Sequence, residues 1–418
     1  MKIACIGNMN NMIFPICRYL NSSGYKSVLF LLEEYEHFLP EADTDKVEIE
    51  IVKLGWNEAM FGQVSPEQIC CTFKEFDFFI GTDCSASYLS KARISLDIYM
   101  PAGSDLFQYP FKKFNHFFPE VWEINKYKCA RNQFWGIKQA TYLSLDTTND
   151  LIEECISKIQ PIGKRIQVLP FLYVENGQYN KVVIPDNLKS FAKEISKADF
   201  VTIQHCRQAW DYNVSNPHYK ANDLLIRGFA YFSKDNPNAL LVLLEYGEHV
   251  ENSKALINDL QIAHQVLWLP KMQRKHLMQF VKMANIGVGE LGHSWLSYGA
   301  VYETLVCDVA FMGFRKDELY KEQYSELYPM INVKSSVEIS DKLEYYYNNQ
   351  EGLAAMGKKG HTWLLKYAIH PSVAKVLKIV ENHQGRSKLP IDWKLVFIQP
   401  YFWFIKIFNF FKIRFMRS

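Results

Sequence analysis

The chain has 418 residues, of which 48% are hydrophobic and 15% aromatic, and its formal net charge is only +2. This length predicts two or three domains with a sizeable core, and the near-neutral charge argues against a nucleic acid as the partner. No C-x-x-C pair occurs among the nine cysteines, which argues against a zinc site or a disulfide framework and favours a reducing compartment, the cytoplasm.

Strand and helix patterns alternate through the first third of the chain. Residues 2–7 (KIACIG) and 26–32 (KSVLFLL) are apolar runs of strand length, and residues 11–25 predict a helix that stops at a glycine. Two further apolar runs, residues 76–83 and 96–105, end in Gly, Thr, Ser or Asp. This alternation predicts a parallel, doubly wound sheet. The N-terminus therefore reads as a first strand and not as a signal peptide, and no apolar run predicts a transmembrane helix.

The same alternation restarts in the second half, after a stretch rich in Pro, Gly and Asn. We therefore predict an α/β architecture of two tandem Rossmann-like domains facing a cleft, residues 1–185 and 186–370. A closing helix over 371–385 and a tail over 386–418 follow. Ligands of open α/β sheets bind beyond the carboxyl ends of the strands, so the cleft between the two domains is the expected site.

Two polar turns follow predicted strands of the first domain. The turn GNMNN at residues 7–11 would let backbone N–H groups approach an anion or a sugar, which makes Asn8 a candidate on the acceptor side. A tight strand-to-helix turn is the alternative. Gly103, Ser104 and Asp105 end a later strand, and Asp105 would orient or deprotonate an acceptor hydroxyl. An Asx-type turn is the alternative for Asp105.

Two cations follow the first predicted strand of the second domain. Arg207 comes after the strand and Lys220 opens the next helix, an arrangement suited to a diphosphate. Solvated surface charges are the alternative. No Asp-x-Asp motif indicates a metal-bound diphosphate, so we expect neither a metal nor a cofactor. His205 and His293, beside these motifs, are further candidates, with His205 as a catalytic residue, and His116 is a weaker one.

A glycine-rich segment with two glutamates spans residues 284–312. Gly289 and Gly292 flank Glu290 and would let the backbone approach a ligand. Glu303 lies near the start of a predicted helix, where its carboxylate could accept hydrogen bonds from two hydroxyls of a ribose or a hexose. An acid favoured by the helix dipole is the alternative reading of Glu303.

Together these segments resemble retaining glycosyltransferases of the GT-B fold, in the glycogen-synthase-like superfamily called glycosyl transferases group 1. The likeness runs from about residue 200 to residue 367. HCRQAW…YKANDLLIRGF resembles the Arg…Lys phosphate clamp of that family, VLWLPKMQRKHLMQFVKMANIGVG its strand, nucleobase helix and next strand, and GAVYETLVCDVAFMG its LEAMACGxPVV segment. The resemblance implies that Arg207 and Lys220 hold the donor diphosphate and that Glu303 contacts the ribose.

The spacing departs from the family pattern at one point. The family has a second glutamate eight residues before the ribose glutamate, near the donor sugar, and Trp295 stands at that position here. Glu290 lies thirteen residues before Glu303. Either the loop carries an insertion and Glu290, near His293, contacts the sugar, or the sugar is held differently.

The C-terminal tail combines cations with aromatic residues. Residues 386–418 contain seven Lys or Arg, one Asp and ten aromatic residues. Its longest uncharged run, LVFIQPYFWFI, is too short to span a bilayer. Aromatics with interleaved cations suit the headgroup region of an anionic membrane. A helix that packs on the body of the protein or on another subunit is the alternative.

We therefore expect a metal-independent, retaining glycosyltransferase that moves a sugar from a nucleotide-sugar donor to a lipid-linked saccharide. It would act in capsule or lipopolysaccharide assembly, on the cytoplasmic face of the cell membrane. One alternative is a nucleotide-sugar epimerase of the same fold or a non-catalytic nucleotide-sugar-binding subunit. Another is a membrane-associated scaffold that binds no nucleotide.

Overall fold

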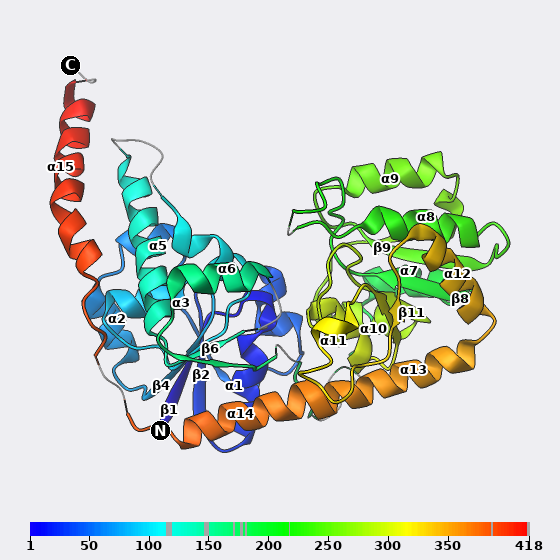
Figure 1. The fold of residues 1–418 in the computed structure, drawn as a ribbon, viewed down its shortest axis with the longest axis horizontal. Helices are drawn as coiled ribbons and strands as arrows, with labels where there is room; N and C mark the ends of the chain where they lie inside the picture. Colours follow the sequence, from blue (N-terminus) through cyan, green and yellow to red (C-terminus); the bar gives the residue numbers. More distant parts are fainter. Residues whose placement is uncertain are drawn as a thin grey trace. The chain divides into compact units, whose positions relative to one another are not determined.

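The structure is a computed structural model that describes residues 1–113, 119–145, 150–169, 172–175, 179, 182–216, 218–385 and 388–415, so His116 lies outside the described residues. The chain forms two compact units. The first comprises Met1–Pro40, Lys46–Leu169 and Ser372–Ser418, and the second comprises Glu41–Asp45 and Pro170–Pro371. Figure 1 shows a twisted sheet with helices packed around it in each unit.

The first unit is built on a sheet of seven parallel strands in the order β3-β2-β1-β4-β5-β6-β7. Its strands are β1 (Lys2–Ile6), β2 (Lys26–Leu31), β3 (Glu50–Lys53), β4 (Phe78–Gly81), β5 (Ile98–Tyr99), β6 (Tyr142–Ser144) and β7 (Lys164–Ile166). The central strands are apolar on both faces because helices cover both sides of a parallel sheet. The strand order reverses between β1 and β4, which pair with Ile6 opposite Gly81. Ligands of such sheets bind beyond the carboxyl ends of the strands at this switch point.

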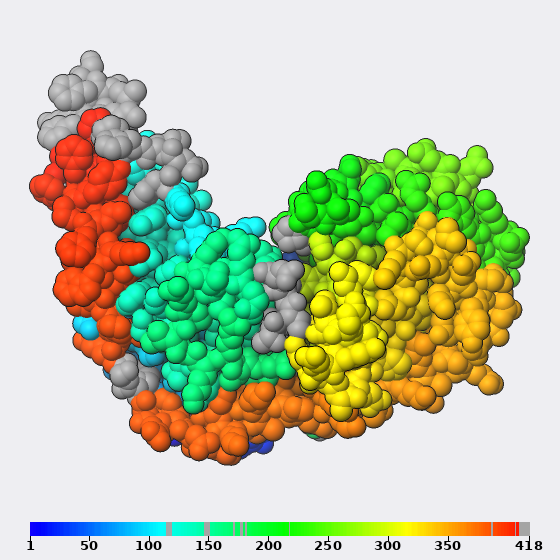
Figure 2. Space-filling model, viewed as in Figure 1, coloured from blue at the N-terminus to red at the C-terminus, as the bar shows by residue number. Residues whose placement is uncertain are grey.

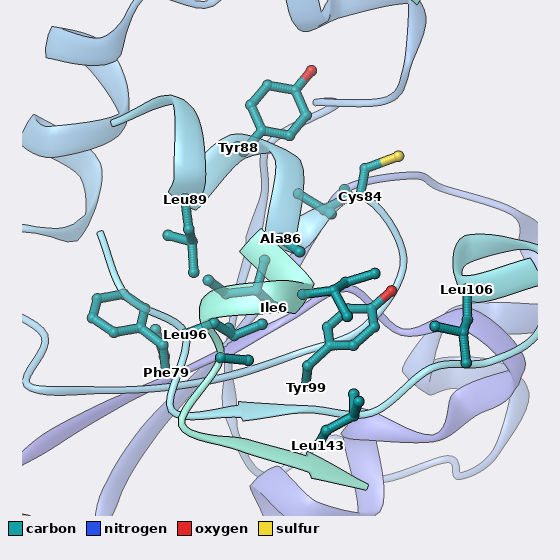
Figure 3. Packing of buried hydrophobic residues seen from close by; sticks show 14 of the residues in the cluster. Ile6, Phe79, Cys84, Ala86, Tyr88, Leu89, Leu96, Tyr99, Leu106 and Leu143 are labelled. Carbon is teal, nitrogen blue, oxygen red and sulfur yellow. The ribbon is translucent and has the colours of Figure 1, made fainter. Parts of the chain in front are cut away.

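Helices cover this sheet and close its core. They are α1 (Ile13–Ser22), α2 (Pro66–Phe73), α3 (Ser85–Lys91), α4 (Ser104–Phe107), α5 (Val121–Gln139), α6 (Asp150–Ile159), α14 (His370–Glu381) and α15 (Trp393–Phe415). Figure 3 shows the packing, in which Ile6, Phe79 and Tyr99 from three strands meet Leu89 of α3 and Leu106 of α4. The core therefore lies directly beneath the carboxyl ends of β1, β4 and β5.

The second unit has a sheet of six parallel strands in the order β10-β9-β8-β11-β12-β13. Its strands are β8 (Phe200–Gln204), β9 (Ala239–Leu244), β10 (Val266–Leu269), β11 (Ile286–Val288), β12 (Ala310–Gly313) and β13 (Ile331–Asn332). Counted from β8, the order is 3-2-1-4-5-6, that of a doubly wound nucleotide-binding sheet. The switch point lies between β8 and β11, where Gln204 pairs with Val288.

The helices of this unit complete the strand–helix alternation. They are α7 (Lys189–Ile195), α8 (Asn222–Phe232), α9 (Val250–Asp259), α10 (Arg274–Lys282), α11 (Gly299–Val306), α12 (Ser336–Tyr347) and α13 (Gln350–Trp363). A π-helical turn, Leu364–Ile369, joins α13 to α14. Gly357 of α13 lies so close to the backbone of Asp308 that a side chain there would overlap it, which explains the glycine.

The predicted fold class of two Rossmann-like domains is confirmed, and the two units divide at other residues than those predicted. The second unit begins at Pro170 and includes Glu41–Asp45, and the chain returns to the first unit at Ser372, within α14. Ion pairs to α10 hold Glu41–Asp45 in the second unit. Such distant pairing leaves no local trace in the sequence.

The predicted tail forms α15, which lies beside α5 of the same unit (Figure 1). Phe402 and Ile405 of α15 pack against Ile124 of α5 and are fully buried. Part of the tail thus packs on the body of its own unit. Among the described residues, no helix combines the length and the apolar character that crossing a membrane requires.

Candidate functional site

Polar residues gather at the switch point of the second sheet. His205 directly follows β8, and Glu290 follows β11 after Gly289. Gln204 Nε2 donates a hydrogen bond to the Gly289 carbonyl at 3.1 Å, which joins the two strand ends. A side chain at Gly289 would overlap the Tyr298 hydroxyl and the Phe311 ring. Only glycine therefore fits at this point of the loop.

The predicted phosphate ligand Lys220 pairs with Glu290. Lys220 Nζ contacts Glu290 Oε1, and both side chains are largely buried. Glu290 Oε2 is buried and has no hydrogen-bond partner within the described part of the chain. The Glu290 N–H donates to the Tyr298 hydroxyl at 2.7 Å, which fixes the backbone. Glu290 therefore balances the charge of Lys220 at the end of the strand, and one oxygen of its carboxylate accepts no hydrogen bond from the described residues.

Arg207 lies in the same loop and faces a neutral histidine. Its Nη2 donates to His218 Nδ1 at 2.8 Å, and its Nη1 lies 3.7 Å from Glu248 Oε1. Burial and the charge of Arg207 lower the pKa of His218, so the ring stays neutral and accepts the hydrogen bond. Arg207 remains partly exposed.

Backbone hydrogen bonds bring the predicted donor residues together. The Lys220 N–H donates to Ala209 O at 2.7 Å, and the Leu291 N–H donates to Lys220 O at 3.1 Å. A side chain at Gly292 would overlap Tyr219. His293 Nε2 lies 2.9 Å from the carbonyl oxygen of Asn216. The loop after β8 and the loop after β11 are therefore one connected structure.

A second group at this edge centres on Glu303. Arg274 Nε lies 2.8 Å from Glu303 Oε1, and His205 Nε2 lies 3.1 Å from Glu303 Oε2. Arg274 Nη1 lies 3.5 Å from Asp43 Oδ1, which also accepts a hydrogen bond from Tyr179 at 3.0 Å. These contacts form a nearly buried relay from Asp43 through Arg274 and Glu303 to His205.

The relay keeps Glu303 ionised. Burial by itself would raise the pKa of Glu303, but the Arg274 guanidinium and His205 outweigh it and bring this pKa down to about 2. The two carboxylates in turn raise the pKa of Arg274 against the effect of its burial. No acid occupies the first turn of α11, and Glu303 lies beyond that turn. The ion pairs of Glu303 therefore account for its charge at this position better than the helix dipole does.

Sequence reasoning missed Arg274, Asp43 and Asp45. The chain does contain an Asp-x-Asp sequence, Asp43–Thr44–Asp45, and its carboxylates pair with Arg274 and with Lys275, whose Nζ lies 2.6 Å from Asp45 Oδ1. The only signal in the sequence is one of matching charge, because two acids one residue apart pair with the two adjacent bases Arg274 and Lys275. Without the structure, nothing connects positions 231 residues apart. Among the residues that the structure describes, no three His, Cys, Asp or Glu side chains are arranged to hold a metal ion.

The switch point of the first sheet carries Asn8. Asn8 Nδ2 donates to Asn11 Oδ1 and to Phe38 O, both at 2.7 Å, and Asn8 Oδ1 accepts from the Phe14 N–H at 2.9 Å. Gly7 has φ +78°, and a Cβ there would lie 2.9 Å from Thr82 O. The Asn8 side chain is thus used to hold the turn, as the tight-turn alternative predicts.

Asp105 holds backbone in place. Its carboxylate accepts hydrogen bonds from the N–H groups of Ala102 at 2.9 Å, Gly103 at 2.8 Å and Asp83 at 3.0 Å, and from the Tyr99 hydroxyl at 2.7 Å. It is almost completely buried. This geometry matches the Asx-type turn and leaves little room for an acceptor hydroxyl. Gly103, with φ +142°, precedes the first residue of α4, Ser104.

Asp83, which sequence reasoning missed, lies beyond β4 at this switch point. It adopts a left-handed conformation with φ +54°. Its N–H donates to Asp105, and its carbonyl accepts from Tyr99 Oη at 3.3 Å and Gln133 Nε2 at 2.8 Å. Burial, reinforced by the negative charges of Asp105 and Glu33, raises the pKa of Asp83 to about 7. The only sequence signal was its position after an apolar strand.

No protein-family model and no curated protein sequence matches this chain. Its structure is similar to solved structures. HepE from Anabaena, in complex with UDP and glucose, has a TM-score of 0.59 and 13% identity, over 92% of this chain and 100% of that one. Sucrose-phosphate synthase from Thermosynechococcus elongatus has a TM-score of 0.58 and 9% identity, over 91% and 98%.

A glycosyltransferase from Rickettsia africae has a TM-score of 0.57 and 10% identity, over 91% of this chain and 99% of that one. The chain has the GT-B fold. Within this GT-B chain, each Rossmann-like unit carries its own polar cluster at the switch point of its own sheet. The cluster of the second unit holds the ionised Glu303, and that of the first unit holds Asp83.

Proposed function

We propose that this protein is a glycosyltransferase that moves a sugar from a nucleotide-sugar donor to a saccharide acceptor. The observation that carries the proposal is the ionised, buried Glu303, which contacts His205 at the carboxyl end of β8, where the loop of Arg207 and Lys220 begins. The GT-B fold, shared with a protein solved with UDP and glucose, supports the same conclusion.

The donor would bind at the switch point of the second sheet. Glu303 would accept hydrogen bonds from the ribose hydroxyls, with Arg274 and His205 holding its carboxylate in position. Arg207, Lys220 and the N–H groups from Gly289 to Gly292 would face the diphosphate and stabilise the charge that develops on it as the sugar leaves. No metal is required for this role in the proposal.

Glu290 has a distinct place in this scheme. It holds Lys220 before the diphosphate arrives, and its free oxygen faces no other described partner. We propose that a sugar hydroxyl takes that oxygen, because a buried carboxylate oxygen without a hydrogen bond is costly. Glu290 would then serve the sugar in place of the family glutamate that Trp295 replaces, and we propose, from the resemblance alone, that transfer retains the anomeric configuration.

The acceptor would bind at the switch point of the first sheet. Asp83, held there by Asp105, Tyr99 and Gln133, would take a hydrogen bond from the acceptor hydroxyl, and its raised pKa suits transfer of a proton near neutral pH. Asn8 and the turn at Gly103 and Ser104 would shape this side. We propose a lipid-linked saccharide in capsule or lipopolysaccharide assembly on the inner face of the cell membrane.

Arg207→Ala tests the proposal. Binding of uridine and guanosine diphosphate sugars, measured by calorimetry, should weaken at least about tenfold, because charge-assisted hydrogen bonds to the diphosphate are lost. Arg227→Ala, which removes another partly exposed arginine of the same unit, is the matched control. An unchanged dissociation constant for Arg207→Ala would point to a scaffold that binds no nucleotide.

The second candidate function is a nucleotide-sugar epimerase or a binding subunit without transfer activity. The replacement of the family glutamate by Trp295 favours it. A panel of saccharide acceptors with each bound donor distinguishes the two. Tight donor binding without transfer to any acceptor, or interconversion of the donor sugar, would support the second candidate.

A further inference from the structure

The helix α15 has two faces of different character. Phe402 and Ile405 are 1% and 0% exposed and form a cluster with Ile124 of α5. The other face carries a stripe of exposed aromatic side chains with Pro400 among them, which are Trp393, Phe397, Trp403, Phe404 and Phe408. Trp393 and Phe397, like Phe404 and Phe408, are four residues apart and therefore lie along one side of the helix. Figure 2 shows α15, in red, on the surface of the first unit.

The base of α15 is fixed to the same unit. Asp392 accepts two hydrogen bonds from Arg131, at 2.6 and 3.0 Å, and both side chains are mostly buried. Arg93 Nε donates to Leu389 O at 2.9 Å, and Trp135 Nε1 donates to Pro390 O at 3.1 Å. Phe397 is nevertheless 79% exposed. The helix is therefore held by one side, and the aromatic stripe is directed away from its support.

The charge of this segment has one sign. The sequence of α15 contains Lys394, Lys406, Lys412 and Arg414 and neither Asp nor Glu. The single acid that precedes it, Asp392, is neutralised by Arg131. Aromatic rings on a helix whose charged residues are all cationic complement a surface with a negatively charged outer layer over an apolar interior.

Similar chemistry continues on α5, the helix that α15 packs against. Val121 and Trp122, in its first turn, are exposed, and Lys126 Nζ lies 4.8 Å from the centre of the Trp122 ring. Lys128 Nζ lies 4.9 Å from the centre of the Phe402 ring. The start of α5 therefore adds another exposed aromatic and two cations, beside the acids Glu120 and Glu123 of its capping box.

We propose that the aromatic stripe of α15 docks on an anionic lipid bilayer, with its rings among the headgroups and the positive charge of the helix attracted to the lipid phosphates. Aromatic and basic side chains on one helix are typical of segments that lie in the plane of the interface. A second copy of this chain is a poorer partner, because the helix would bring cations against cations, and lysine is depleted in protein interfaces. The inference rests on α15 and does not depend on the proposed function.

The test measures co-sedimentation of the full chain with vesicles of phosphatidylcholine alone and with vesicles that also contain phosphatidylglycerol. Wild type should bind the anionic vesicles much more tightly, and added salt should weaken this binding. Phe397→Ser combined with Phe404→Ser should weaken binding to anionic vesicles at least about tenfold, since two rings leave the interface. Both side chains are exposed, so the cluster around Ile124 stays intact.

The matched control changes two aromatic residues that are also exposed but lie in the second unit, Tyr231→Ser and Tyr345→Ser. This control should bind vesicles like wild type. Equal binding of the Phe397/Phe404 variant and wild type would overturn the proposal, and so would equal binding of wild type to neutral and anionic vesicles. A dimer that wild type forms and the Phe397/Phe404 variant loses, seen by analytical ultracentrifugation without vesicle binding, would assign the face to a second copy.

Discussion

Replacing Glu303 with Gln should destabilise the second unit by an amount that depends on pH. The substitution keeps the shape of the side chain and removes the charge that faces Arg274 at 2.8 Å. The folded state brings the pKa of Glu303 from 4.5 down to about 2. At about 1.4 kcal/mol per pKa unit, the ionised carboxylate contributes roughly 3 kcal/mol to the free energy of unfolding at neutral pH.

The sign of the pH dependence follows from the direction of this shift. A carboxyl group with a lowered folded-state pKa contributes its full stability above the unfolded value of 4.5, and this contribution is lost as the pH falls toward about 2. Wild type and Glu303→Gln should therefore differ by roughly 3 kcal/mol at neutral pH and by much less at the acid end of this range.

Urea unfolding of both proteins at neutral and acid pH, followed by circular dichroism, measures this difference. Glu251→Gln is the control, because Glu251 is exposed and pairs only at the surface with Lys254; its effect should be small at either pH. The reasoning is refuted if Glu303→Gln costs nothing at neutral pH, or if its cost is the same at both. Under conditions where it stays folded, Glu303→Gln should also weaken nucleotide-sugar binding at least about tenfold.

Two further predictions concern the other buried carboxylates. Burial raises the pKa of Asp83 from 3.8 to about 7, so its ionisation opposes folding and the stability of wild type falls as the pH rises through this range. Asp83→Asn should therefore be more stable than wild type above pH 7 and about equally stable near pH 4. Urea unfolding measures this, and the same difference in stability at both pH values would contradict the prediction. If Asp83 serves the acceptor, Asp83→Asn should also lose transfer while it keeps donor binding. Asp43→Asn leaves Arg274 with Glu303 as its remaining carboxylate partner in the relay, and we expect a loss of about 1–3 kcal/mol in urea unfolding. Asp45→Asn removes an exposed carboxylate, although its partner Lys275 is largely buried, and should cost less than Asp43→Asn.

The central strands were predictable because parallel strands buried on both faces leave continuous apolar runs, whereas β3 and β7, at the edges of the first sheet, contain charged, exposed residues and were not predicted. The run predicted at residues 26–32, for example, contains β2 (Lys26–Leu31). The positions of Glu290 and Glu303 at the sheet edge followed from the same pattern. Their ion pairs with Lys220 and Arg274 could not be predicted, because these pairs depend on how the loops bring residues that are distant in the sequence within hydrogen-bond distance.

Asp105 and α15 show two further features that could not be predicted from the sequence. A carboxylate after a strand has the same sequence pattern whether it faces a ligand or backbone N–H groups, and only the structure shows that Asp105 accepts from the N–H groups of Ala102, Gly103 and Asp83. The sequence of α15 is aromatic around its circumference. Which of its faces is buried depends on where Ile124 of α5 lies.

The passages of the chain between the two units also determine when each can finish folding during synthesis. Asp43 emerges from the ribosome 231 residues before Arg274, a delay of roughly 10–50 s at ordinary translation rates. The contacts of the first unit are completed even later, because Leu169 donates its N–H to Ser372 and Arg131 pairs with Asp392. The seven strands of the first unit are all translated by Ile166, but this unit can be completed only after the whole second unit has been translated, because α14 and α15 follow that unit in the chain.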